Sequence, residues 1–362
     1  MEVSFKKLFS SFQTTSVLQP KKVVGIDFGA SSIKVVEVQM LEGVITLSTY
    51  GELQLGPYAN VDMGSTTSLP MEKKIEALVD VMRESGVTAS DGVFALPLAD
   101  SFVTVIEISA KENEDITPRI HVESRKYIPI PLSEVALEWI ENPRKGKKDI
   151  LVREIMLAAV QQTSVMTLNK VLEAVKMTSK PAEIELFSTL RSVTVETDAI
   201  LAVIDLGAQT SKLYIAEGGF LRRIHRVQTG GADSTKVLAK ELSVSFEEAE
   251  NIKRNYNATD THGSRIKQIV ERSYTPVLQE FQRVISQYEL RTGAPITRIA
   301  LTGGSVLFPE SIPLVKQVLG KEATITNPFT KIAYPAFLED TLLSIAPVFT
   351  VALGAALRHF EK

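Results

Sequence analysis

The sequence lacks several features that mark particular classes of protein. It contains no cysteine, which excludes disulfides and thiolate-based metal or nucleophile sites. Its 40 Lys and Arg residues nearly balance 43 Asp and Glu residues, so no overall basic field attracts nucleic acid. The longest uncharged stretch, residues 341–357, is shorter than the roughly 20 apolar residues of a spanning helix, and it contains Pro347 and Gly354. We therefore expect a buried terminal helix there. The N-terminus has no apolar segment after its two lysines, so we expect residues 1–20 to be a tail and not a signal peptide.

What is present is the composition of an ordinary globular protein. The 362 residues are 44% hydrophobic and 23% charged, proportions that are typical of a folded chain. At roughly 150 residues per domain, this length indicates two domains or one protein with several lobes.

The most informative feature is an internal repeat. Residues 24–34, VGIDFGASSIK, align with residues 202–212, AVIDLGAQTSK. In both copies an apolar strand precedes D-x-G-A-x-[S/T]-x-K. Each copy continues into an alternating strand, a glycine-containing turn (Glu42-Gly43 or Gly218-Gly219) and another strand, a pattern that predicts a hairpin. Because the two copies are separated by about half of the chain, they predict two related lobes and not a solenoid, whose repeats are much shorter.

The repeated turn has the chemistry of a phosphate-binding loop. Glycine lets a ligand approach the main chain, and N–H groups beside Ser or Thr hydroxyls can bind phosphate oxygens. An Asp precedes each turn and would repel phosphate unless a divalent cation lies between them, as Mg²⁺ commonly does. Two such turns could therefore hold a Mg-nucleotide between the lobes. The alternative is that each D-x-G only ends a strand, and the duplication argues against it.

Two further glycine motifs follow the second turn. Residues 296–301 predict an apolar strand that leads into Thr302-Gly303-Gly304-Ser305 and a helix, which again brings main-chain amides to a ligand. Gly230-Gly231 opens another helix, and Glu250 and Lys253 lie three residues apart on one face of a later helix. Alone, that Glu–Lys pair would indicate a solvated salt bridge. Its place in the order of motifs suggests a role at the same ligand.

This order of motifs resembles that of the actin-like ATPase superfamily. The segments VESRKYIPIPLSEVALEW, RIALTGGSVLFPESIPLVKQVLG and APVFTVALGAALR are further similar to the PilM family of type IV pilus assembly proteins. The resemblance covers about residues 22–360, and the FtsA family is the nearest competitor. It implies an α/β fold of the actin-like ATPase type, with duplicated ribonuclease-H-like lobes and subdomains 1A, 1C, 2A and 2B.

The resemblance also implies subdomain boundaries. After the N-terminal tail, it assigns 21–90, 180–200 and 340–362 to 1A, 91–179 to 1C, 201–235 and 298–339 to 2A, and 236–297 to 2B.

Carried over residue by residue, the resemblance implies the following site. Asp27 and Asp205 would hold Mg²⁺ through water, and Glu250 and Lys253 would approach the ribose and adenine of ATP or ADP. The phosphate turns would contain Gly29, Ala30, Ser31, Ser32, Lys34, Gly207, Gln209 and Thr210. The rest of the pocket would be Gly230, Gly231, Gly303, Gly304 and Ser305. Lys34 and Lys212 could each contact phosphate or be an exposed strand lysine, and for Lys212 we favour exposure, since the family motif does not require a lysine there.

Whether the protein hydrolyses ATP stays open in the sequence. Hydrolysis needs a group that orients or deprotonates water near the γ-phosphate. Asp205 is a candidate catalytic residue, although its competing role is at the metal, and no dedicated base is evident elsewhere. We expect slow turnover or none.

The implied function is that of a nucleotide-bound adaptor in pilus assembly. The expected location is cytoplasmic, with contact to the inner membrane only through partners. The expected partners are the N-terminal cytoplasmic peptide of PilN, in a groove between 1A and 1C, and other proteins of the pilus platform, with self-association possible and nucleic acid not expected. Strands near 91–109 could offer an edge and apolar anchors, although side chains such as Phe94, Leu96, Val103 and Val105 could equally be core.

Two other functional classes were weighed. An FtsA-like membrane-associated filament protein would carry a linker and an amphipathic helix after the core helix, where this chain has only residues 358–362. A metabolite kinase would need a substrate base and a sugar pocket. The large 1C insertion and the A-E-x-x-K block favour the adaptor.

Overall fold

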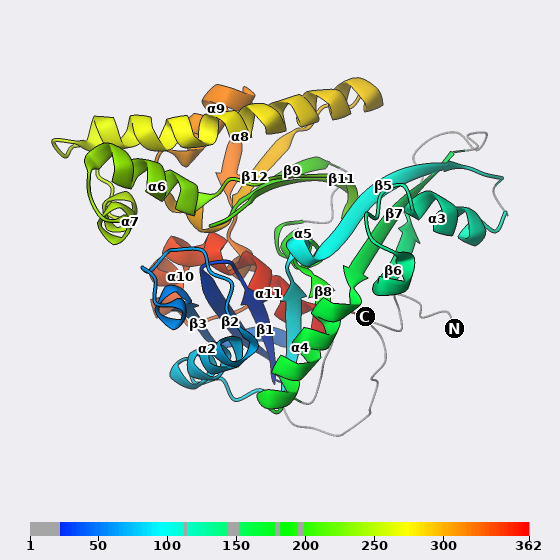
Figure 1. Ribbon diagram of the computed structural model, residues 1–362, viewed down its shortest axis with the longest axis horizontal. Coiled ribbons are helices and arrows are strands. Elements are labelled where there is room, and N and C mark those ends of the chain that lie inside the picture. Colours follow the sequence, from blue (N-terminus) through cyan, green and yellow to red (C-terminus); the bar gives the residue numbers. More distant parts are fainter. Residues whose placement is uncertain (1–21, 112–113, 143–151, 178–181, 195–198, 362) are drawn as a thin grey trace.

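The computed structural model describes residues 22–111, 114–142, 152–177, 182–194 and 199–361. The expected N-terminal tail, residues 1–20, lies outside them. Within the described residues the chain forms two lobes and an inserted three-stranded sheet (Figure 1).

The first lobe is built on a five-stranded sheet with the order β3-β2-β1-β4-β8. Strands β1, β2 and β3 are antiparallel neighbours, while β4 runs parallel to β1 and β8 runs parallel to β4. The strands are β1 Lys22–Phe28, β2 Ser32–Leu41, β3 Val44–Gln54, β4 Asp91–Leu96 and β8 Ala182–Ile184. The helices of this lobe are α2 Met71–Glu84, α5 Glu185–Val193, α10 Glu339–Ile345 and α11 Thr350–Leu357.

The second lobe repeats this topology strand for strand. Its sheet has the order β11-β10-β9-β12-β13, with β9, β10 and β11 antiparallel and β12 and β13 parallel to β9. The strands are β9 Ile200–Leu206, β10 Ser211–Glu217, β11 Phe220–Val227, β12 Arg298–Thr302 and β13 Ala323–Ile325. The helices are α6 Gly231–Leu242, α7 Phe246–Arg254, α8 Gly263–Thr292 and α9 Ser311–Leu319. The two identical strand orders confirm the predicted duplication.

Both predicted hairpins form around the predicted turns. The turn residues Glu42 and Gly43 have φ of 50° and 83°, and Gly218 and Gly219 have φ of 58° and 82°. Two consecutive left-handed residues match the twist of the flanking strands in a two-residue hairpin.

The inserted unit is a sheet of order β5-β7-β6, formed by β5 Ser101–Ser109, β7 Val152–Gln161 and β6 Val135–Glu141. Helix α3, Thr117–Ser124, packs on one face through Ile120, against Ile155 and Leu157. The other face, which carries Met156 and Ala158, packs into a core shared with both lobes, and α4, Gln162–Ala174, joins that core.

Two boundaries differ from those expected. The strand at 91–96 is expected in 1C, but this strand, β4, pairs with β1 and β8 in the sheet of the first lobe. The segment around Phe329, expected in 2A, packs with Val36 and Val38 of the first lobe, and Ala333 bridges Thr46. Hydrophobic patterning marks a buried strand but does not say which sheet receives it.

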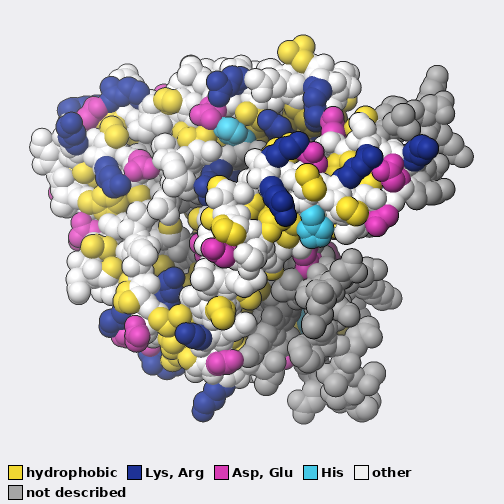
Figure 2. Space-filling view, turned by 45° about the vertical axis from the view of Figure 1, so that its right-hand side comes forward, with side chains coloured by type: hydrophobic (Ala, Val, Ile, Leu, Met, Phe, Trp, Pro, Cys, Tyr) yellow, Lys and Arg dark blue, Asp and Glu magenta, His cyan; other side chains and the backbone are white. Residues whose placement is uncertain are grey.

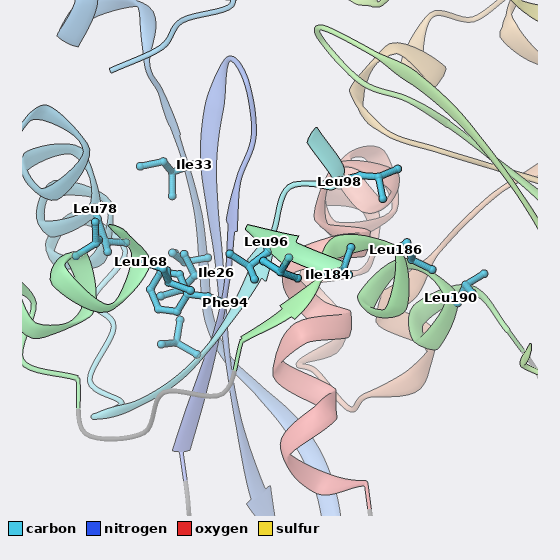
Figure 3. Close-up of a cluster of buried hydrophobic side chains, with 14 of the residues drawn as sticks. Ile26, Ile33, Leu78, Phe94, Leu96, Leu98, Leu168, Ile184, Leu186 and Leu190 are labelled. Carbon is cyan, nitrogen blue, oxygen red and sulfur yellow. The ribbon is translucent and has the colours of Figure 1, made fainter. Parts of the chain in front are cut away.

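The shared core explains why β4 belongs to the first lobe. Figure 3 shows Phe94 and Leu96 of β4 beside Ile26 of β1, with Leu168 of α4 and Leu78 of α2 closing the cluster. Phe94 is 1% exposed and Leu96 is 6% exposed, so neither side chain is available as a peptide anchor.

Helix α11 lies in the core of the first lobe, as predicted. A Cβ at Gly25 would fall 1.9 Å from the carbonyl oxygen of Ala352, and a Cβ at Gly354 would fall 1.9 Å from that of Ser188. Glycine at these two positions therefore lets α11 pack directly on β1 and α5. The segment Ala336–Phe360 is long and apolar enough to cross a membrane by composition, but 67% of its most apolar window is buried inside the protein.

The surface carries mixed charge on the face shown in Figure 2. Lys and Arg side chains there are interspersed with Asp and Glu, and hydrophobic side chains are scattered among them. On this face the described residues form no single field of one sign.

Candidate functional site

A cleft of about 440 Å³ lies between the two lobes. The lobes supply its walls from the ends of β1 and β9, the starts of β2 and β10, and the loops after β4 and β12. Every predicted site residue lines this cleft except Gly230. A Cβ at Gly230 would fall 2.5 Å from the carbonyl oxygen of Ala208, so this glycine packs behind the second phosphate turn.

The two D-x-G turns have the same backbone hydrogen bond. The N–H of Gly29 donates to the carbonyl of Ser32 at 3.0 Å, and the N–H of Gly207 donates to the carbonyl of Thr210 at 3.1 Å. This hydrogen bond joins each turn to the start of the hairpin that follows it. Both turns face the same cleft from opposite lobes. The repeat seen in the sequence is a repeat of local geometry.

The T-G-G-S turn closes a third side of the cleft. Gly303 has φ of +90°, and a Cβ there would fall 2.5 Å from Oδ1 of Asp205, so only glycine fits. A Cβ at Gly304 would meet nothing within 4 Å. The hydroxyl of Ser305 donates to the carbonyl of Gly207 at 3.4 Å, which ties this turn to the second phosphate turn.

Glu250 and Lys253 form a partly buried network in the wall of the cleft. Their side chains are 2.6 Å apart, Thr235 Oγ1 donates to Glu250 at 2.6 Å, and Lys253 donates to the carbonyl of Gly231 at 3.0 Å. Burial by itself raises the pKa of Glu250, but the charge of Lys253 and its hydrogen bonds outweigh burial and leave the pKa lowered. The pair is therefore an ordered ionic part of the cleft wall and not a solvated surface salt bridge.

Lys212 is buried, and our expectation of an exposed position is wrong. Its ammonium group donates to Oδ2 of Asp205 at 3.0 Å and to Oε2 of Glu185 at 2.9 Å. Burial opposes its charge, but the two carboxylates outweigh burial and hold the pKa of Lys212 well above its ordinary value. Oε1 of Glu185 in turn accepts the backbone N–H of Leu98 at 2.7 Å.

The equivalent pair in the first lobe is looser. Asp27 and Lys34 face each other in the same register as Asp205 and Lys212, yet the Lys34 nitrogen lies 3.9 Å from Asp27 and donates to Ser32 at 2.8 Å. Burial, only partly opposed by Lys34, raises the pKa of Asp27 to about 6. Asp27 is consequently the less strongly paired carboxylate of the two.

The residues present fit a magnesium ion poorly at Asp205. Among the residues that the structure describes, no group of three or more His, Asp or Glu side chains could hold a metal ion. Asp205 already binds an ammonium group, and its other oxygen lies against Gly303. Asp27 could still approach a phosphate-bound Mg²⁺ through water, the outer-sphere mode that Mg²⁺ commonly adopts.

Sequence reasoning missed four charged residues of the cleft wall: Glu52, Glu185, Arg226 and Arg254. Glu185 begins α5 and reaches the cleft from the first lobe, although no motif surrounds it in the sequence. Arg226 and Tyr274 also line the cleft. Arg226 could have been found from its hairpin register, because it lies opposite Lys212.

Comparison with solved structures shows that the chain has an actin-like fold. It is similar to the ethanolamine utilization protein EutJ from Carboxydothermus hydrogenoformans, with 16% identity, a TM-score of 0.53, and coverage of 98% of this chain and 94% of that one. It is also similar to MreB5 of Spiroplasma citri bound to ADP, with 9% identity, a TM-score of 0.52, and coverage of 92% and 94%. The fold of this chain is therefore the one that the actin-like ATPases share.

The similarity is stronger to one structure described as a PilM-PilN type IV pilus biogenesis complex. Identity is 22%, the TM-score is 0.78, and the match covers 94% of this chain and 99% of that chain. The family model for type IV pilus assembly protein PilM matches residues 25–360. The chain belongs to this family.

Proposed function

We propose that the protein is a nucleotide-binding adaptor of the inner-membrane platform that assembles type IV pili. Membership of the PilM family supports the place in pilus assembly. The observation that carries nucleotide binding is the pair of matching D-x-G turns facing one cleft from two lobes, with the T-G-G-S turn beside them. ATP or ADP would place its phosphates against the two turns and its adenosine between the Glu250–Lys253 pair and Gly304.

Calorimetric titration with ADP and ATP tests the cleft. Gly304→Val should weaken binding by about tenfold or more. Its side chain enters open space, so the fold should be retained while the cleft is filled. The affinity of Gly304→Ala for ADP and ATP should lie between that of Gly304→Val and that of the wild type. Equal affinities for all three proteins would contradict nucleotide binding at this position.

Magnesium enters this proposal only at Asp27. The ion would reach the cleft on the nucleotide and neutralise part of its phosphate charge, and Asp27 would hold its water shell. Asp27→Asn should then reduce the dependence of nucleotide affinity on Mg²⁺.

We further propose that the N-terminal peptide of PilN docks between the first lobe and the inserted sheet. A related chain has been solved in a PilM-PilN complex. Strand β6 forms one edge of the inserted sheet, and Ile140 on it is 43% exposed. Ile140 lies opposite Met156, which belongs to the core that the inserted sheet shares with both lobes, so Ile140 lies on the face of the inserted sheet that is turned toward the lobes. A peptide that adds a strand to an edge uses main-chain hydrogen bonds for affinity and apolar side chains for specificity.

A labelled PilN-tail peptide, followed by fluorescence anisotropy, tests this docking site. Ile140→Lys should weaken binding by about tenfold, because it places a charge at the apolar edge. Val122→Lys is the matched control: Val122 is 60% exposed in the same subdomain, but on α3, which covers the opposite face. An equal loss of peptide affinity in both variants, or no loss in either, would contradict this docking site.

The location follows from the same proposal. A protein that binds the cytoplasmic tail of an inner-membrane partner would be cytoplasmic and would lie at the membrane through that partner. Other platform proteins and further copies of the chain are additional candidate partners. Fractionation of cells with and without PilN tests this, since loss of PilN should release the protein from the membrane fraction.

A further inference from the structure

Lys212 lies where two carboxylates of the cleft converge. Asp205 comes from β9 and Lys212 from β10 of the second lobe, while Glu185 comes from α5 of the first lobe. All three are almost entirely buried, at 6%, 8% and 9% exposure. A single ammonium group therefore pairs with two buried carboxylates, compensates one of their two negative charges, and joins the lobes at the base of the cleft.

Three of the four carboxylate oxygens already accept a hydrogen bond, and the fourth, Oδ1 of Asp205, lies beside Gly303, where an added Cβ would fall 2.5 Å from it. Asp205 uses one oxygen for Lys212 and packs the other against Gly303. Glu185 uses one oxygen for Lys212 and the other for the N–H of Leu98. A divalent ion entering here would have to displace the ammonium group and would meet its repulsion first.

The duplicated position shows that a lysine at this register does not always pair in this way. Lys34 occupies the same register opposite Asp27, but it lies 3.9 Å away and donates to Ser32 instead. The difference in the second lobe is Glu185, whose carboxylate draws Lys212 to the base of the cleft.

We propose that Lys212 is the resident counter-ion of Asp205 and Glu185, and that neither carboxylate holds a divalent cation while Lys212 is present. The functional meaning of this inference rests on the proposed nucleotide site, because both concern the same cleft. An ammonium group has three N–H donors. Two are used for Asp205 and Glu185, and the third can be offered to a phosphate oxygen. Lys212 thus occupies the carboxylate of Asp205, where the sequence suggested a metal, and its third donor is the one that a phosphate oxygen would use.

Titration of the full-length protein with Mn²⁺, followed by the EPR signal of free Mn²⁺, tests this without any nucleotide. Asp205→Asn in the otherwise wild-type chain should leave Mn²⁺ affinity unchanged within about twofold, because Asp205 holds no metal. Lys212→Met should tighten Mn²⁺ binding by about tenfold or more, since it exposes two uncompensated carboxylates to the ion. Adding Asp205→Asn to Lys212→Met should abolish that gain.

The exposed pair of Lys236 and Asp233, 3.2 Å apart, provides a matched control. Lys236→Met also frees an aspartate from a lysine, but a single solvated carboxylate should not gain measurable Mn²⁺ affinity. Two results would overturn the inference: loss of wild-type Mn²⁺ binding on Asp205→Asn, or a folded Lys212→Met variant that gains no affinity. If Lys212→Met does not fold, the Asp205→Asn measurement alone still decides. Since nucleotide is absent throughout, the outcome is separate from whether the cleft binds ADP.

Discussion

Gly64 of the first lobe lies directly against the side chain of Glu250 in the second lobe. A Cβ at Gly64 would fall 3.0 Å from Cγ of Glu250, and the N–H of Gly64 donates to Gln54 at 3.2 Å. Both Gly64 and Glu250 line the cleft. The loop that carries Gly64 therefore joins the lobes across the end where we propose that adenosine binds.

We predict that Gly64→Ala weakens ADP binding by about fivefold, because the added methyl group displaces Glu250. Gly64 has φ of +82°, so alanine there also strains the backbone by about 1–2 kcal/mol. Gly43 provides the matched control, since its φ is +83° and a Cβ there would meet nothing within 4 Å. Gly43→Ala should lose similar stability in thermal unfolding while calorimetry shows unchanged ADP affinity. The same affinity for both variants would show that the contact with Glu250 has no role in binding.

We predict that the isolated protein hydrolyses ATP more slowly than about 1 s⁻¹, the low end of ordinary enzyme rates. A group that activates water must be free to accept a proton. Asp205, the candidate from the sequence, and Glu185 are both bound to Lys212. Phosphate release should therefore be slow and should change little in Asp205→Asn. Rapid hydrolysis that this substitution abolishes would make Asp205 a catalytic residue.

We predict that Glu37→Gln destabilises the fold by about 2 kcal/mol, a typical contribution of hydrogen bonds to a charged group. The buried Glu37 carboxylate accepts the backbone N–H groups of Thr88 and Ala89 at 2.6 and 2.7 Å. Burial raises its pKa, but these bonds, together with those of Ser48 and Lys22, outweigh burial and leave the pKa below its ordinary value. An acid with a lowered folded pKa stabilises the fold above its unfolded pKa and loses that contribution as the pH falls through the folded pKa.

Denaturant unfolding at several pH values checks this prediction. The difference in the free energy of unfolding between wild type and Glu37→Gln should have its full value at pH 7. It should shrink below about pH 4.5, the ordinary pKa of the group. A difference that does not depend on pH would show that the ionised form of Glu37 has no special part in stability.

We predict the opposite pH dependence for Glu138 of β6. Its two carboxylate oxygens are buried and have no hydrogen-bond partner among the described residues, and burial raises its pKa from 4.5 to about 8. The folded protein keeps this proton up to about pH 8, whereas the unfolded chain releases it above about pH 4.5. The stability of the wild type should therefore fall as the pH rises between these values.

Glu138→Gln removes this titration, so the variant should be more stable than the wild type at pH 9 and similar to it at pH 4. Unfolding midpoints across this range measure the difference. Glu134→Gln, an exposed position beside the same strand, should stay within about 0.5 kcal/mol of wild type throughout. A wild-type stability that does not fall from pH 5 to pH 8 would contradict the buried, unpaired state of Glu138.

Nearly all of the site residues that the sequence predicted line the cleft, because the motifs that contain them are local. In VGIDFGASSIK and AVIDLGAQTSK, the strand, the turn and the hydroxyl residues are neighbours in the chain, so their geometry follows from short-range rules. The T-G-G-S turn was found for the same reason. Gly230 was included as part of a glycine pair, but only its neighbour Gly231 reaches the cleft.

The network around Lys212 could not be predicted in this way. Whether Lys212 is exposed depends on Glu185, which lies 27 residues earlier on a helix of the other lobe. No periodicity or motif connects the two positions. Similarly, β4 reads as a buried strand from its sequence, but only its pairing with β1 shows that it belongs to the first lobe.

The sequence alone therefore determined the duplicated lobes, the two D-x-G turns and the family, because each rests on residues that are adjacent in the chain or repeated along it. The tertiary structure alone decided which charges meet at the base of the cleft. Asp205 and Lys212 face each other through strand pairing, and Glu185 joins them only when the two lobes come together. The energy of a buried charge depends on its neighbours in space, and folding brings those neighbours from distant parts of the chain.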